Sequence, residues 1–203
     1  MTTSGIKVVF LDVGGVLLSN GWGHESRQKA AEVFGLDYSE LDTLHHFIYN
    51  VFEMGKISLD DYLDTVVFHE PRDFSREEFK TFMYGASKEL PDLLAWLKSW
   101  SNVCGFRIFS INNESREIND FRIEKFGLQE VFDGFFTSCH VGMRKPDPGI
   151  FNIALDIAQV KPEHSVYFDD REMLVKAAGK MGINSFHHKK AEETIKILKN
   201  LKK

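Results

Sequence analysis

Residues 8–20, VVFLDVGGVLLSN, begin as an apolar strand and end as a glycine-containing loop. Four consecutive apolar residues place a single carboxylate, Asp12, at the end of the predicted strand, and Gly14 and Gly15 follow almost directly. In an open parallel sheet, ligands bind at the C-terminal ends of the strands. A charged residue at the end of a hydrophobic strand therefore predicts a functional site.

Similar apolar runs recur along the chain at 105–109, 134–137, 165–168 and 184–186, and the first run extends over 7–11. Helical patterns separate the later runs, and their boundaries are indicated by Pro91, Asn113, Gly127, Asp147-Pro148, Glu172 and Gly182. Strands that alternate with helices form right-handed βαβ units. The predicted fold class is therefore α/β, a Rossmann-like parallel sheet with helices on both faces.

Residues 19–85 interrupt this alternation, because they carry only helical patterns. Two capping boxes indicate helix starts, Ser58 with Asp61 and Ser75 with Glu78. We therefore predict a core domain formed by residues 1–18 and 86–203, with a helical cap domain, 19–85, inserted directly after the first strand. The lysine-rich segment 191–203 is predicted to be a solvated surface helix.

Composition excludes several function classes. The chain has 203 residues and a formal net charge of −5, which argues against a nucleic-acid footprint. No apolar run approaches the roughly 18 residues of a membrane span. No signal-peptide pattern is evident at the N-terminus, so a cytoplasmic location is expected. Two cysteines, Cys104 and Cys139, are too few for a disulfide framework. The negative net charge does not exclude a small anionic substrate, since a local pocket can be positive on an acidic protein.

Polar residues at the predicted strand ends converge on one crevice. Strand two ends at Ser110, which precedes Ile111 and Asn112, and strand four ends at Asp169-Asp170. Three clustered carboxylates repel one another unless a proton or a hard divalent cation intervenes, and Mg²⁺ is the expected ion. Between these strands, the loop 142–148 carries Lys145, which together with Ser110 supplies a charge and a donor for a phosphoryl group.

These ordered segments resemble the four motifs of the haloacid dehalogenase-like (HAD) hydrolase superfamily, over nearly the whole chain. Asp12 resembles the first motif, Ser110 the second, Lys145 the third and Asp169-Asp170 the fourth. The segments MRKPDPGIF (143–151) and FEMGKIS (52–58) are similar to the subgroup with a helical cap after strand one.

The resemblance implies a role for each position. Asp12 would be the nucleophile that forms an aspartyl-phosphate, and Lys145 would restrain Asp12 and bind phosphoryl oxygens together with Ser110, Ile111 and Asn112. The metal would be held by Asp12, the Gly14 carbonyl, Asp169 and Asp170. Other readings stay open: Ser110 or Asn112 as helix caps, and Asp170 as an exposed turn residue.

Gly14 departs from the family pattern, in which an acid two residues after the nucleophile transfers protons. That help is typically worth about 10²–10⁴-fold in rate. Either the loss is uncompensated and substrates with good leaving groups are favoured, or another group substitutes, with His24 as the first candidate.

The resulting functional prediction is a Mg²⁺-dependent phosphatase acting on a small phosphorylated metabolite, such as a sugar phosphate. Two alternatives remain: a haloacid dehalogenase, and a catalytically weak protein that binds or senses a phosphometabolite. No nucleic-acid or membrane partner is expected.

Overall fold

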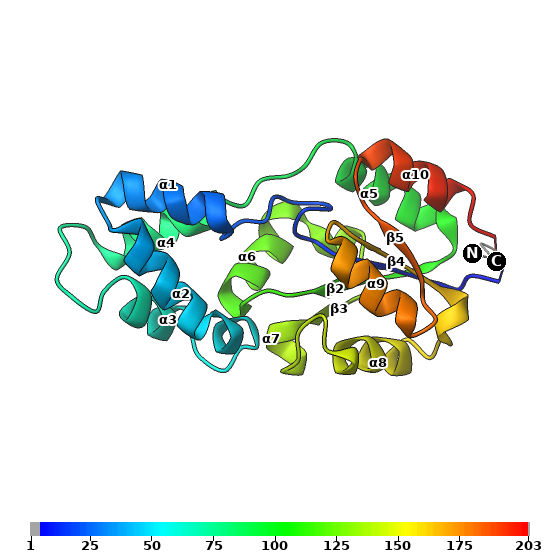
Figure 1. Cartoon of the computed structure of the whole chain (residues 1–203). Helices are drawn as coiled ribbons and strands as arrows, with labels where there is room; N and C mark the ends of the chain where they lie inside the picture. Colours follow the sequence, from blue (N-terminus) through cyan, green and yellow to red (C-terminus); the bar gives the residue numbers. More distant parts are fainter. Residues whose placement is uncertain (1–4, 203) are drawn as a thin grey trace.

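A computed structural model describes residues 5–202, and five parallel strands form its central sheet. The sheet order is β3-β2-β1-β4-β5, so the strand that carries Asp12 lies in the middle (Figure 1). The strands are β1 (Val8–Leu11), β2 (Arg107–Asn112), β3 (Gly134–Thr137), β4 (Ser165–Asp169) and β5 (Asn184–His187). The predicted Rossmann-like α/β fold is confirmed.

The central strand is buried on both faces, which explains its uninterrupted apolar sequence. Val9 and Leu11 of β1 belong to one apolar cluster, whereas Val8 and Phe10 belong to another on the opposite face. Helices α5 (Leu93–Cys104) and α10 (Ala191–Lys199) contribute to the first cluster, and α8 (Pro148–Ile157) and α9 (Glu172–Lys180) to the second. The sheet is thus covered on both sides, and only its strand ends are left for a site.

Four helices lie between β1 and α5 and extend away from one end of the sheet (Figure 1). They are α1 (His24–Phe34), α2 (Tyr38–Glu53), α3 (Leu59–Val66) and α4 (Arg76–Gly85). Most of their buried residues form an apolar cluster of their own, which includes Tyr62 and Phe79. Both predicted capping boxes are formed, at Ser58 and Ser75. All four helices fall within 19–85, whereas residues 1–4 and 203 of the predicted core lie outside the described residues.

The second strand ends later than predicted. It continues to Asn112, because Ile111 and Asn112 pair in register with Phe136 and Thr137 of β3. Ser110 therefore lies within the strand and not at its end, which corrects the predicted boundary.

The starts of two helices also differ from those predicted from the sequence. Helix α6 (Arg116–Phe126) begins three residues after Asn113, and it ends at Gly127 in the predicted left-handed conformation, with φ of 60°. Helix α5 begins at Leu93 because Asp92 has φ of 73°, which is outside helical geometry. The remaining elements are short: α7 (Ser138–Val141), η1 (Leu128–Glu130) and η2 (Pro162–His164). None of the helices within 5–202 has the length and apolar character needed to cross a bilayer.

Candidate active site

Asp12 stands immediately after the central strand, with its backbone fixed by the sheet. Its N–H donates to the carbonyl of Phe168 at 2.9 Å, which continues the pairing of β1 with β4. Its Oδ1 accepts a hydrogen bond from the Val13 N–H at 2.8 Å, and the residue is only 6% exposed. The sheet therefore holds one nearly buried carboxylate at a defined position.

Lys145 connects the predicted nucleophile to the fourth strand. Its Nζ lies 2.9 Å from Asp12 Oδ1, 2.8 Å from Asp169 Oδ2 and 3.0 Å from the hydroxyl of Tyr167. The loop that carries Lys145 is fixed by Asn113, whose side chain accepts from the Lys145 N–H at 2.8 Å and donates to its carbonyl at 2.9 Å. One ammonium group thus bridges two buried carboxylates.

The electrostatics of this group favour an additional cation. Burial raises the pKa of Asp12 to about 7, and Asp169 adds to that rise while Lys145 opposes it. Burial and Asp169 also raise the pKa of Asp170. Burial alone would lower the pKa of Lys145, but its two carboxylate partners raise it overall. One lysine therefore does not balance three acids, and a divalent cation would stabilise their ionised forms.

The three acids are arranged closely enough to share such a cation. Asp12, Asp169 and Asp170 each offer a carboxylate oxygen, and these oxygens lie within 4.8 Å of one another. Among residues 5–202, Asp170 Oδ1 is buried without a hydrogen-bond partner, which is costly for a carboxylate that no ion contacts. Carboxylate oxygens are the ligands that Mg²⁺ prefers, so these residues fit a hard divalent ion.

A cavity of about 270 Å³ opens between the strand ends and the four inserted helices. Four of the predicted site residues line it, Asp12, Gly14, Asn112 and Lys145. The other lining residues from 86–203 are Asn113, Glu114, Ile118, Arg122, Arg144, Arg171 and Leu174. The lining residues from 19–85 are Asn20, Trp22, Gly23, His24, Arg27, His45, His46, Tyr49, Phe52 and Glu53. The volume is close to the lower end of typical ligand sites, about 300–1,000 Å³.

Ser110 and Ile111 do not line this cavity. Both are fully buried within β2, and Ile111 belongs to an apolar cluster beneath the sheet. Asn112 does line the cavity, and its Nδ2 has no hydrogen-bond partner among residues 5–202. Of the three predicted contacts on β2, Asn112 is the one that lines the cavity, two residues closer than Ser110 to the end of the strand. The Ser110 Oγ is likewise buried without a hydrogen-bond partner among residues 5–202.

Gly14 lies two residues after Asp12, the predicted nucleophile, and its backbone would tolerate a side chain. Its φ is not in the left-handed region, unlike that of Gly15, which is 73°. A Cβ at Gly14 would lie 3.2 Å from Asn20 Oδ1 and 3.9 Å from Arg122 Nη1. The space of the missing acid is therefore bordered by an amide and a guanidinium group.

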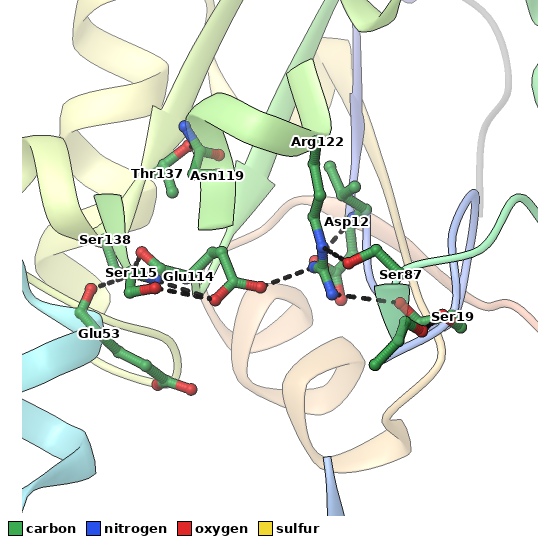
Figure 2. A network of polar contacts seen from close by, with 12 residues as sticks. Asp12, Ser19, Glu53, Ser87, Glu114, Ser115, Asn119, Arg122, Thr137 and Ser138 are labelled. Atoms are coloured by element: carbon green, nitrogen blue, oxygen red, sulfur yellow. Dashed lines mark hydrogen bonds and ion pairs between the residues drawn. The ribbon is translucent and has the colours of Figure 1, made fainter. Parts of the chain in front are cut away.

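Arg122 is the largest fully buried side chain among the described residues, although its helix looks polar in sequence. Figure 2 shows its guanidinium between Glu114, Ser87 and Ser19. Nη1 pairs with Glu114 Oε2 at 2.7 Å, Nε donates to Ser87 Oγ at 3.0 Å, and Nη2 contacts the Ser19 carbonyl at 3.4 Å. Ser19 lies between β1 and α1, and Ser87 lies between α4 and α5. Arg122 therefore contacts both of the segments that connect the inserted helices to the core, and these segments are called the two crossings below.

The inserted helices also contact the core beside Lys145. Arg144 donates to Glu53 at 2.9 and 2.7 Å and to Asn50 at 2.6 Å, both on α2. Ser138 donates to the Glu53 carbonyl at 2.6 Å (Figure 2). The end of α2 is thereby held against the loop that carries the site lysine.

His24, the predicted substitute for the missing acid, lines the cavity but is exposed. Its Nδ1 lies 2.6 Å from the hydroxyl of Tyr38, and the two rings pack edge to face. The structure thus places His24 at the cavity wall formed by the inserted helices.

Family comparison agrees with this geometry. The model of the haloacid dehalogenase-like hydrolase family matches residues 6–182. The chain belongs to this family. In this HAD-like hydrolase, Asp12 and Asp169-Asp170 therefore stand at the strand ends at which the sheet topology places a site, and the Lys145 ammonium contacts Asp12 and Asp169 there.

Two relatives match over most of their length. The chain is 24% identical over 197 residues to D-ribitol-5-phosphate phosphatase from Bacteroides thetaiotaomicron, covering 89% of this chain and 91% of that protein. It is 27% identical over 193 residues to phosphorylated carbohydrates phosphatase from Thermotoga maritima, covering 90% and 84%. A HAD family enzyme from B. thetaiotaomicron, solved as a magnesium complex, has the same fold, with a TM-score of 0.79 and 19% identity over 92% of this chain and 94% of that one.

Other relatives are much longer proteins. The chain spans 33% of haloacid dehalogenase-like hydrolase domain-containing protein 3 from Bos taurus and 10% of bifunctional epoxide hydrolase 2 from Mus musculus. These matches cover 83 and 56 residues, at 37% and 43% identity.

Proposed function

We propose that this HAD-like hydrolase is a Mg²⁺-dependent phosphatase that cleaves a small phosphorylated metabolite, such as a sugar phosphate. The observation that carries the proposal is the contact of Lys145 with both Asp12 and Asp169 at the end of the central strand, beside a third carboxylate. The two relatives that match over most of their length are both named as phosphatases of phosphorylated carbohydrates or polyols, which supports this substrate class.

Asp12 is the nucleophile in the proposed reaction. Its Oδ1 is held by Val13 N–H and Lys145, which leaves Oδ2 to attack phosphorus in line. The new bond joins Asp12 oxygen to phosphorus, and the ester P–O bond breaks with its electron pair on the leaving oxygen, which then takes a proton. Water next attacks the phosphorus and releases inorganic phosphate and the Asp12 carboxylate.

The other residues bind and neutralise charge. Lys145 and the free amide of Asn112 contact the phosphoryl oxygens, whose charge grows in the transition state. A magnesium ion held by Asp12, Asp169 and Asp170, with the carbonyl of Gly14 as a further ligand, would supply Lewis-acid stabilisation of the same oxygens. Residues 19–85 act as the cap domain that closes the site against water, on a core of 1–18 and 86–203.

Metal dependence is the first test of this function. Turnover of p-nitrophenyl phosphate with Mg²⁺ is expected to fall at least about tenfold in excess chelator and to return when Mg²⁺ is restored, because three carboxylates then repel substrate phosphate. Halide release from 2-haloacids that is unaffected by chelator would instead favour a dehalogenase. Phosphate binding without turnover of a panel of phosphate esters would favour the binding or sensing alternative.

Gly14→Asp tests whether the missing acid limits the reaction. We expect kcat on a poor-leaving-group alkyl phosphate to rise about 10- to 100-fold, with little change on p-nitrophenyl phosphate, because only the alkoxide needs a proton in the first step. Gly14→Ala is the matched control for the displacement of Asn20, which lies 3.2 Å from the new Cβ. An unchanged alkyl phosphate rate in Gly14→Asp would mean that another group already protonates the leaving oxygen, and loss of activity in His24→Ala would then identify His24.

A further inference from the structure

A histidine on the cap side of the cavity is held in one fixed orientation. His45, on α2, is 9% exposed and lines the cavity. Its ring stacks on Tyr49, with centroids 5.1 Å apart and an interplanar angle of 22°, and packs edge to face against Tyr62. Rotation of this ring would disrupt both contacts, so its two nitrogens have separate environments.

A chain of hydrogen bonds assigns the proton on His45. The indole Nε1–H of Trp22, which can only donate, lies 2.8 Å from the hydroxyl oxygen of Tyr62. The same hydroxyl lies 2.8 Å from His45 Nδ1 and is fully buried. Within residues 5–202, Nδ1 is the one acceptor offered to the buried O–H of Tyr62. Nδ1 therefore accepts, and the proton of the neutral ring is on Nε2.

The ring is neutral in this environment. Burial lowers the pKa of His45 to about 3, and the positive charge of Arg27 and the neighbouring His46 act in the same direction. Asp42 opposes them with a smaller effect. His45 is thus a dipolar donor and does not add a positive charge to the cavity.

The Nε2–H has no partner among the described residues, and it is not one of the buried unpaired atoms. Because the ring borders the cavity, this N–H is available to a molecule inside it. Three of the arginines that line the cavity, Arg27, Arg122 and Arg144, each pair with a carboxylate. His45 Nε2–H is therefore an uncharged donor on this wall.

We propose that the Nε2–H of His45 binds a hydroxyl or carbonyl oxygen in the organic part of the substrate, and so selects hydroxylated phosphate esters over plain alkyl ones. This inference rests on the proposed phosphatase function and adds a specificity residue to it. A buried donor that loses its acceptor is left unpaired, which is why such a contact discriminates strongly.

The test uses two esters of equal chain length, D-ribitol 5-phosphate and pentyl phosphate. In the wild-type protein, kcat/KM is expected to be higher for the hydroxylated ester. His45→Phe, which keeps a ring but no donor, should lower kcat/KM on D-ribitol 5-phosphate about 10- to 100-fold and on pentyl phosphate less than about threefold. His45→Gln, which restores an N–H donor, should recover part of the difference, whereas a merely structural role would affect both esters equally.

Two further measurements test this inference separately from the proposed phosphatase function. Nitrogen NMR of the histidine rings should show His45 as the Nε2–H form at neutral pH. Calorimetric binding of both esters to the Mg²⁺-loaded Asp12→Asn variant should show the same His45-dependent preference without turnover. Turnover with no effect of His45→Phe on the ester preference overturns the inference and leaves the phosphatase intact. If the His45-dependent binding preference is found but the wild-type protein hydrolyses neither ester, only the phosphatase proposal is overturned. If NMR shows the proton of the neutral His45 ring on Nδ1, the inference about His45 is overturned.

Discussion

Asp12→Asn is expected to lower kcat on p-nitrophenyl phosphate by about 10⁴-fold or more, the largest effect of any single substitution in this chain. The amide removes the proposed nucleophile, so the proposed covalent intermediate could not form, and it removes one of the three carboxylates that fit a metal ion. It also weakens the pairing of Lys145, which lies 2.9 Å from Asp12 Oδ1. A loss of this size exceeds what weaker substrate binding alone would produce.

The measurement is steady-state turnover with Mg²⁺ present, alongside a thermal unfolding curve. The fold should persist, because asparagine has the same shape and the pKa of Asp12 is already raised by burial, so removing its charge relieves repulsion with Asp169. Asp156→Asn is the matched control, since Asp156 is exposed on α8 far from the cavity lining. Activity of Asp12→Asn within tenfold of the wild type would mean that phosphoryl transfer does not pass through Asp12.

The fold and the centre of the site could be predicted from sequence because both follow from strand periodicity. Once the apolar runs form a parallel sheet, their C-terminal ends share one edge, and this brings Asp12 and Asp169 together without any knowledge of side-chain positions. Lys145 follows because its loop comes after β3, whose C-terminal end lies at the same edge, and before α8, which leads the chain away from that edge to the start of β4. The family match and the parallel sheet confirm the predicted family and fold, and the contacts of Lys145 show that the three side chains lie together.

The C-terminal end of β2 could not be predicted correctly from its own apolar pattern, because pairing with a neighbouring strand sets where it ends. The apolar run ends before Ser110, yet pairing with β3 extends the strand to Asn112. A strand end is fixed by the length of its neighbour as well as by its own residues. Within β2, the polar residue that lines the cavity is therefore Asn112, the last residue of the strand, whereas Ser110 lies inside the strand and does not line the cavity.

Arg122, Glu114 and His45 are not predicted from sequence, because polar and titratable residues in or beside a helical pattern ordinarily indicate a solvated face. Helix α6 reads REINDFRIEKF, and nothing in that pattern distinguishes the buried Arg122 from exposed neighbours. Arg122 differs from them because the two segments that connect the core to the inserted helices, at Ser19 and Ser87, both contact its guanidinium in the folded chain. Such tertiary partners are far apart in sequence and leave no local periodicity.

Arg122→Met is expected to lower the free energy of unfolding by about 3–5 kcal/mol, because it leaves a buried Glu114 carboxylate without its counter-charge. It also removes donors from Ser87 and from the Ser19 carbonyl, at both crossings. Urea unfolding at neutral pH measures the loss. The double variant Arg122→Met with Glu114→Gln should be more stable than Arg122→Met alone, because no unpaired charge is then buried.

The pH dependence of that loss identifies its cause. Burial raises the pKa of Glu114, and Arg122 partly offsets this rise, so removing Arg122 should raise the pKa further. A carboxyl whose pKa is higher in the folded than in the unfolded protein costs stability as pH rises above its ordinary value, about 4.3. The deficit of Arg122→Met should therefore be smaller near about pH 5 than near about pH 8, while the Glu114→Gln double variant should lack this dependence. An equal deficit at both pH values would assign the loss to the serine contacts and the packing of the guanidinium, and the charge of Glu114 would then have little part in holding the inserted helices to the core.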